Sequence, residues 1–150
     1  MERANSRLSA DLESERFCTA FLAFLAPDGT LEWCSAGHGP ILFRSSGDSA
    51  TQELVPGELP LGVMPELTGD PSPPLMLAPG GLLAVISDGI FEAMNNGSEQ
   101  FGMERVIELI GLEPKASAPQ IIATLRDAAT KWTGSEEPTD DQTIVVVRRV

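Results

Sequence analysis

The sequence predicts an α+β fold in which two sheets pack in layers with helices on the outside. Segments 17–25 and 82–86 are apolar or small at both alternate sets of positions, as in strands that are covered on both faces. Later in the chain, apolar residues recur at helical spacing over two segments, which indicates amphipathic helices packed on a sheet. With 150 residues, the chain is expected to form one globular unit.

The first half of the chain reads as successive hairpins. Residues 27–30 are Pro-Asp-Gly-Thr, a strong turn sequence between the strand at 17–25 and a returning strand at 31–35. A second pair of strands is predicted at 41–44 and around 52–55. Hairpins in succession favour an antiparallel sheet. The Pro-rich and Gly-rich stretch that follows, 56–74, is expected to be a long surface connection.

The second half alternates buried strands with helices. The strand at 82–86 ends at Ser87-Asp88-Gly89, and a helix is predicted from about 102 to 110. A capping box at Ser117 to Gln120 begins a second helix, which should end near Gly134. An acidic loop over 135–141 then leads into a final strand, 142–149, rich in Val and Ile.

The charge of the chain restricts its partners. Ten Lys and Arg against 22 Asp and Glu give a net charge of −12, which argues against nucleic acid or an anionic membrane surface as the main partner. No apolar run approaches the ~20 residues that cross a bilayer, and the first residues lack the pattern of a secretory signal. We therefore expect a cytoplasmic protein for which a cation is the more natural ligand.

Acidic residues stand at the ends of two predicted buried strands. Asp88 follows one strand and is followed by Gly89, while Asp140 and Asp141 precede another. Adjacent carboxylates repel each other unless a cation or hydrogen bonds offset the charge, and hard oxygen ligands select Mg²⁺ or Mn²⁺. The two clusters, if they meet, suggest metal-assisted hydrolysis of a phosphate ester. The alternative is an ordinary Asp-Gly turn and a solvated Asp-Asp loop.

A series of short motifs occurs in a fixed order from about residue 8 to residue 150: Phe17-Cys-Thr-Ala-Phe21, Ser35-Ala-Gly-His-Gly-Pro40, Pro60-Leu-Gly-Val63, Leu77-Ala-Pro-Gly80, Ser87-Asp-Gly-Ile-Phe-Glu-Ala93, Phe101-Gly102 and Asp140-Asp-Gln-Thr143. Together they resemble the SpoIIE/RsbU-type branch of the PPM (type 2C) protein phosphatases. The resemblance implies an αββα sandwich, a two-metal Mn²⁺ or Mg²⁺ centre, and hydrolysis of phosphoserine or phosphothreonine.

Carried over by position, the resemblance makes Asp88 and Asp140 the catalytic metal ligands, with Asp141 as a further ligand or neighbour and Gly89 shaping the turn. Ser87 stands where the family has threonine, and Glu92 is expected to face solvent or water near the metal. His38 is tempting as a general acid, but we interpret it as a structural residue whose imidazole bonds to backbone at a turn between strands.

One departure from the family is an absence. The family's domain normally begins with roughly a hundred further residues, much of a typical domain, which carry Gly-Asp motifs that complete the metal centre. By this resemblance we expect residues 1–16 to match the end of the preceding helix and 17–150 the C-terminal part of the domain, without its N-terminal portion.

The sequence is therefore consistent with two functions. The first is a phosphatase acting on a phosphorylated STAS-domain anti-anti-sigma factor in sigma-factor regulation, by family analogy. The second is a catalytically incomplete half-domain that binds a regulatory protein. A partial sandwich would also leave strand edges uncovered, so we expect a homodimer or larger assembly.

Overall fold

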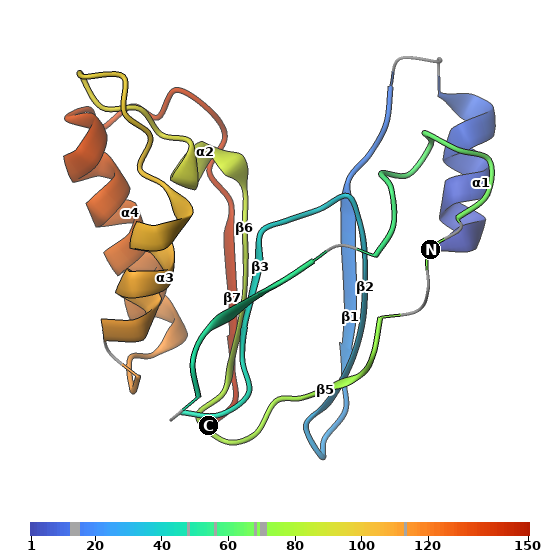
Figure 1. The fold of residues 1–150 in the computed structure, drawn as a ribbon, viewed down its shortest axis with the longest axis horizontal. Helices are drawn as coiled ribbons and strands as arrows, with labels where there is room; N and C mark the ends of the chain where they lie inside the picture. Colours follow the sequence, from blue (N-terminus) through green and yellow to red (C-terminus); the bar gives the residue numbers. More distant parts are fainter. Residues whose placement is uncertain (13–15, 48, 56, 68, 70–71, 113) are drawn as a thin grey trace. The chain divides into compact units, whose positions relative to one another are not determined.

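The computed structural model describes residues 1–12, 16–47, 49–55, 57–67, 69, 72–112 and 114–150 (Figure 1). The chain forms two compact units, where the sequence predicted one. The first unit joins Met1–Gly39 with Val55–Met76, and the second joins Pro40–Leu54 with Leu77–Val150. Each unit has its own sheet and at least one helix, so the predicted α+β class is confirmed. Within the described ranges, no helix has the length and apolar character needed to span a bilayer.

The first unit contains α1 (Glu2–Asp11), β1 (Ala20–Leu25), β2 (Thr30–Ala36) and β5 (Leu75–Met76). Its sheet has the order β1-β2-β5 with antiparallel neighbours. The predicted hairpin is confirmed, because β1 pairs with β2 along its whole length. Gly29 in the connecting turn has a φ of 98°, a left-handed conformation that glycine adopts readily.

The prediction that the first strand is covered on both faces is wrong. β1 lies at the edge of its sheet, and its four residues Leu22 to Leu25 are exposed. The side chains of Leu22 and Phe24 are 58% and 67% exposed. Since residues of both alternate sets are exposed, neither face of the second half of β1 is covered by the described residues.

A buried asparagine ties α1 to the long connection of the first unit. Asn5 is 1% exposed, and its Nδ2 donates to the carbonyl oxygens of Met64 and Pro65 at 3.0 and 3.1 Å. Its Oδ1 accepts a hydrogen bond from the Gly62 N–H at 2.9 Å. The helix predicted within 1–16 is present as α1, whereas residues 13–15 lie outside the described residues.

His38 follows β2 in the first unit. Its Nδ1 lies 3.3 Å from the hydroxyl oxygen of Thr19, and its backbone carbonyl accepts a hydrogen bond from the Ser35 hydroxyl at 2.6 Å. The partner of the imidazole is thus a side chain and not the backbone group that the sequence suggested. These contacts fasten the turn after β2 to the segment that leads into β1.

The second unit contains β3 (Ile41–Arg44), β4 (Gln52–Leu54), β6 (Leu82–Ile86), α2 (Asp88–Phe91), α3 (Met103–Leu112), α4 (Ala118–Thr133) and β7 (Ile144–Arg148). Its antiparallel sheet has the order β4-β3-β6-β7. Figure 1 shows α3 and α4 side by side over one face of this sheet. The sequence placed the strands and both long helices within a few residues of these bounds.

The core of the second unit is built around β6. All five of its residues are buried, as expected for a strand with β3 on one side and β7 on the other. Leu82, Ala84 and Ile86 pack in one cluster with buried residues of both helices, including Val106 and Leu125. The ends of α4 follow the predicted signals: a capping box at its start, and a left-handed C-cap glycine with a φ of 69° at its end.

One charged side chain is buried in this unit. Arg44, at the end of β3, is 2% exposed, and its Nη1 donates a long hydrogen bond of 3.5 Å to the Ile110 carbonyl. Its Nε and Nη2 have no hydrogen-bond partner among the described residues. Burial, and to a lesser extent the positive charge of Arg148, lowers the pKa of Arg44 below its usual value. The register sets Leu82 between the backbones of these two arginines.

Candidate functional site

The first acidic turn is positioned by the end of β6. Ser87 is the N-cap residue of the short helix α2, and Asp88 is the first residue of that helix. Ile86 and Gly89 are buried, whereas Asp88 is exposed. The buried strand therefore ends where the chain presents one carboxylate to solvent.

Ser87 fastens this turn to the acidic loop before β7. Its N–H donates to the Thr143 carbonyl at 2.9 Å, and its hydroxyl accepts a hydrogen bond from the Thr143 N–H at 2.8 Å. The same hydroxyl donates to the Asp141 carbonyl at 3.0 Å. Since Ile86 and Ile144 are partners in the antiparallel ladder, the two turns meet at the same edge of the sheet. The structure thus brings the two predicted acidic segments together.

Gly89 lies where the two segments approach most closely. A Cβ atom at this position would lie 2.3 Å from the Asp141 carbonyl oxygen and 3.0 Å from its carbon. The Gln142 side chain adds a further link, because its Nε2 donates to the Gly89 carbonyl at 3.1 Å. Glycine is therefore required here because a Cβ atom would have no space.

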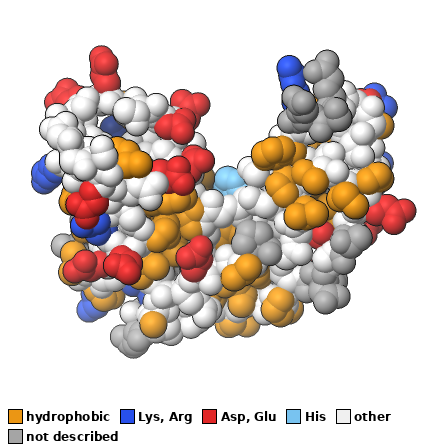
Figure 2. Space-filling model, turned by 45° about the horizontal axis from the view of Figure 1, so that its top comes forward, with side chains coloured by type: hydrophobic (Ala, Val, Ile, Leu, Met, Phe, Trp, Pro, Cys, Tyr) orange, Lys and Arg blue, Asp and Glu red, His pale blue; other side chains and the backbone are white. Residues whose placement is uncertain are grey.

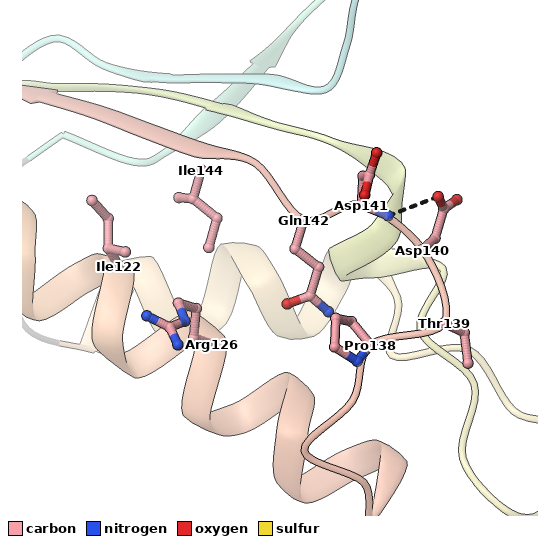
Figure 3. A pocket seen from close by; sticks show the side chains of 8 residues that line it. All are labelled: Ile122, Arg126, Pro138, Thr139, Asp140, Asp141, Gln142 and Ile144. Atoms are coloured by element: carbon pink, nitrogen blue, oxygen red, sulfur yellow. Dashed lines mark hydrogen bonds between the residues drawn. The ribbon is translucent and has the colours of Figure 1, made fainter.

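The three carboxylates supply hard oxygen donors. One oxygen of Asp88 accepts from the Gly89 N–H at 3.0 Å, and one oxygen of Asp140 accepts from the Asp141 N–H at 2.7 Å (Figure 3). All three side chains are exposed. Among the described residues, no three Asp, Glu, His or Cys side chains are close enough to hold one metal ion. Asp88, Asp140 and Asp141 therefore do not converge as three ligands of one ion, and their assignment as metal ligands stays a prediction.

A groove of about 680 Å³ lies beside the acidic loop. It is lined by Ile122, Arg126, Pro138, Thr139, Asp140, Asp141, Gln142 and Ile144. Figure 3 shows Ile122 and Arg126 on α4, Ile144 at the start of β7, and the other lining residues on the loop before that strand. The groove therefore continues from two of the candidate metal ligands toward a cationic side chain.

Sequence reasoning did not identify the supporting roles of Gln142 and Thr143 or the position of Arg126. Gln142 and Thr143 belong to the Asp-Asp-Gln-Thr motif, so their presence in the motif was a signal, but their hydrogen bonds to Gly89 and Ser87 depend on tertiary contact. Arg126 lies on the polar side of a helix and has no sequence signal of its own.

Surface charge agrees with the composition. Figure 2 shows Asp and Glu side chains at many places on the visible face of the molecule. The chain has 22 acidic and 10 basic residues, so a positively charged side chain such as Arg126 in the groove stands out from a mostly acidic protein. A single guanidinium beside the acidic turns therefore changes the local charge noticeably.

The protein-family model for stage II sporulation protein E (SpoIIE) matches residues 1–150. No protein with a curated description matches the sequence. Among solved structures, the SiaA-PP2C domain of Pseudomonas aeruginosa is 18% identical with a TM-score of 0.74, over 95% of this chain and 56% of that one. The SpoIIE phosphatase domain of Bacillus subtilis, from a crystal presoaked with Mn, is 21% identical with a TM-score of 0.68, over 97% and 62%.

The RsbU and RsbW domains of a Mycobacterium tuberculosis protein are 20% identical with a TM-score of 0.74, over 96% of this chain and 40% of that one. This chain therefore spans less than two thirds of the length of each of these structures. At such identities the likeness shows the fold, which is that of the PP2C phosphatase domains. Because the family model extends over all 150 residues, the chain belongs to the SpoIIE family.

Proposed function

We propose that the chain is a module of a divalent-cation-dependent protein serine/threonine phosphatase. The observation that carries the proposal is the joining of two acidic turns at one sheet edge by Ser87, in a chain of the SpoIIE family. Asp88 on one turn and Asp140 on the other are the proposed catalytic ligands, and Asp141 is a further ligand. Gly89 and Gln142 hold the turns in contact.

The proposed cation is Mn²⁺ or Mg²⁺, since carboxylate oxygens are the ligands that these ions prefer. When bound, such a cation lowers the pKa of a coordinated water and draws charge from a phosphoryl group. The residues described in this chain provide only part of such a centre, because no three ligating side chains converge among them. Further ligands are thus required for the two-metal centre that the family resemblance implies.

The proposed substrate is a phosphorylated STAS-domain protein of the anti-anti-sigma type, with the cytoplasm as the expected compartment. This part of the proposal rests on membership of the SpoIIE family and on the likeness to a structure that contains RsbU and RsbW domains. The net charge of −12 supports a protein substrate over nucleic acid.

A second function is favoured by one observation. The lack of three converging ligands among the described residues suits a module that binds a regulatory protein without turning it over. In that case the acidic turns would hold a cation weakly, with the affinity expected of a few exposed carboxylates.

Manganese titration by calorimetry, combined with a phosphatase assay on a phosphorylated STAS protein, separates the two functions. Asp88→Asn tests the proposed ligand, and Asp127→Asn on α4 is the matched control, because Asp127 is also exposed and lies outside the groove. The phosphatase function requires turnover that Asp88→Asn abolishes and Asp127→Asn preserves. Binding of the STAS protein without turnover, whether or not manganese is present, would support the binding module instead.

We also propose that the chain associates with a second copy through β1. In the described part of the chain, β2 is the only strand that pairs with β1, and β1 exposes Leu22 and Phe24 on one face. Free edges of identical strands can pair to form a symmetric dimer. Sedimentation of the wild type and of a Leu22→Ser, Phe24→Ser double variant at tens of micromolar tests this. A dimer that dissociates in the variant supports the proposal, and a monomeric wild type contradicts it.

A further inference from the structure

The groove beside the acidic loop holds one cationic side chain. Arg126 projects from α4 and is exposed, and it makes no hydrogen bond or ion pair with another described residue. Arg105 on α3, by contrast, donates to the Phe101 carbonyl at 2.7 Å and stacks 4.1 Å from the Trp132 ring. Unlike Arg105, Arg126 therefore has guanidinium N–H donors that are available to a ligand in the groove.

The remaining walls of the groove are of two kinds. Ile122 and Ile144, which are partly buried, contribute apolar surface, while Asp140 and Asp141 line it from the acidic loop. The amide of Gln142 is already engaged with the Gly89 carbonyl. An extended peptide in this groove would thus find apolar contacts, one free guanidinium, and the candidate metal ligands nearby.

Charge complementarity identifies the group that Arg126 would bind. A guanidinium binds carboxylates through a planar set of donors, and in a chain of net charge −12 such a group is needed to hold an acidic segment close to the surface. An acidic side chain of the substrate can meet this guanidinium while the phosphorylated residue of the same segment lies at the acidic turns. A basic side chain at the same position would instead be repelled by the guanidinium of Arg126.

We propose that Arg126 is a specificity-determining residue, which selects phosphoprotein segments that carry an acidic side chain close to the phosphorylated residue. The proposal rests on the phosphatase or phosphoprotein-binding function proposed above and adds to it a recognition site that includes Ile122 and Ile144. Arg126 acts on affinity and not on the chemical step, because it contacts the flanking segment of the substrate.

The test uses a pair of synthetic phosphoserine peptides, one with glutamates on both sides of the phosphoserine and one with glutamines at the same positions. Binding is measured by fluorescence anisotropy and turnover by phosphate release, for the wild type, Arg126→Ala and Arg126→Glu. Lys131→Ala is the matched control, because Lys131 is an exposed cation on the same helix that does not line the groove. Turnover of p-nitrophenyl phosphate, which has no flanking segment, reports the chemical step alone.

We expect the wild type to prefer the glutamate peptide by about threefold to fivefold, the size of an exposed charge pair. Arg126→Ala should remove this preference, Arg126→Glu should reverse it, and Lys131→Ala should retain it. On turnover, the effect should appear in KM with kcat unchanged. The proposal is overturned if Arg126→Ala keeps the wild-type preference, if Lys131→Ala loses it equally, or if neither peptide binds the wild type.

Binding and turnover together separate this inference from the proposed activity. A preference for the glutamate peptide in binding that Arg126→Ala removes, without turnover of either peptide, supports the recognition site and contradicts the enzymatic function. Turnover of both peptides at equal kcat/KM supports the enzyme and overturns the role of Arg126.

Discussion

The strands β1 and β6 have nearly the same sequence pattern and opposite environments. β1 reads Ala-Phe-Leu-Ala-Phe-Leu and exposes its last four residues, whereas β6 reads Leu-Leu-Ala-Val-Ile and buries all five. The neighbours differ: β6 pairs with β3 and β7 and lies under helices, while among the strands that the structure describes β1 pairs only with β2. An apolar pattern thus indicates that a strand is suited to burial. Whether its side chains are buried depends on which other segments of the chain pack against them.

The largest expected effect separates the two strands directly. Leu82→Ala in β6 should lower the free energy of unfolding by about 3 kcal/mol, because Leu82 is fully buried and the substitution leaves a cavity. Leu22→Ala in β1 should change it by less than about 0.5 kcal/mol, since Leu22 is 58% exposed. Urea unfolding followed by circular dichroism measures both, and equal losses would show that Leu22 is buried in solution.

A smaller effect tests whether close packing extends from β6 into the acidic turn. Gly89→Ala should destabilise the protein by about 2 kcal/mol, because the new methyl group meets the backbone of Asp141. Gly111→Ala in α3 is the control, since apart from its own stretch of helix no described residue lies within 4 Å of its added Cβ. That control should stabilise the protein by up to about 1 kcal/mol through helix propensity. If Gly89→Ala is as well tolerated as Gly111→Ala, the turns are not in contact.

The smallest effect tests whether the second unit is well packed throughout. Arg44→Met should raise the free energy of unfolding by about 1 kcal/mol, because it replaces a buried charge, two of whose nitrogens lack partners among the described residues, with an apolar chain. Arg105→Met should lower it by about 1 kcal/mol, since it removes a cation–π contact and a hydrogen bond. Thermal unfolding of both variants provides the comparison, and a loss for Arg44→Met would show that its guanidinium has a partner in solution.

Local signals predicted the elements of the fold well. The Pro-Asp-Gly turn fixed the first hairpin, and the Ser117 to Gln120 box with Gly134 gave the limits of α4, because caps and turns act within a few residues. Burial was predicted correctly for β6 and wrongly for β1, because burial depends on neighbours that are distant in sequence. The division into two units likewise depends on long-range contacts and has no local signal.

The candidate site was predictable in its acidic residues and not in the contacts that hold them. Asp88 and Asp140 stand at strand ends in recognisable motifs. The contact between their segments follows from the pairing of β6 with β7, which the sequence does not specify. For the same reason the spatial need for Gly89 and the presence of Arg126 in the groove became evident only from the structure.

The hydroxyl of Ser87 has a mechanical consequence for the site. It forms hydrogen bonds with the Asp141 carbonyl and the Thr143 N–H at the same time. The start of α2 and the loop before β7 are therefore mechanically coupled and move together. A ligand that pushes Asp141 aside from the groove must also move the residue that precedes Asp88. Occupancy of the groove and the position of the opposite carboxylate are thereby linked, and Ser87→Ala would let each turn move alone.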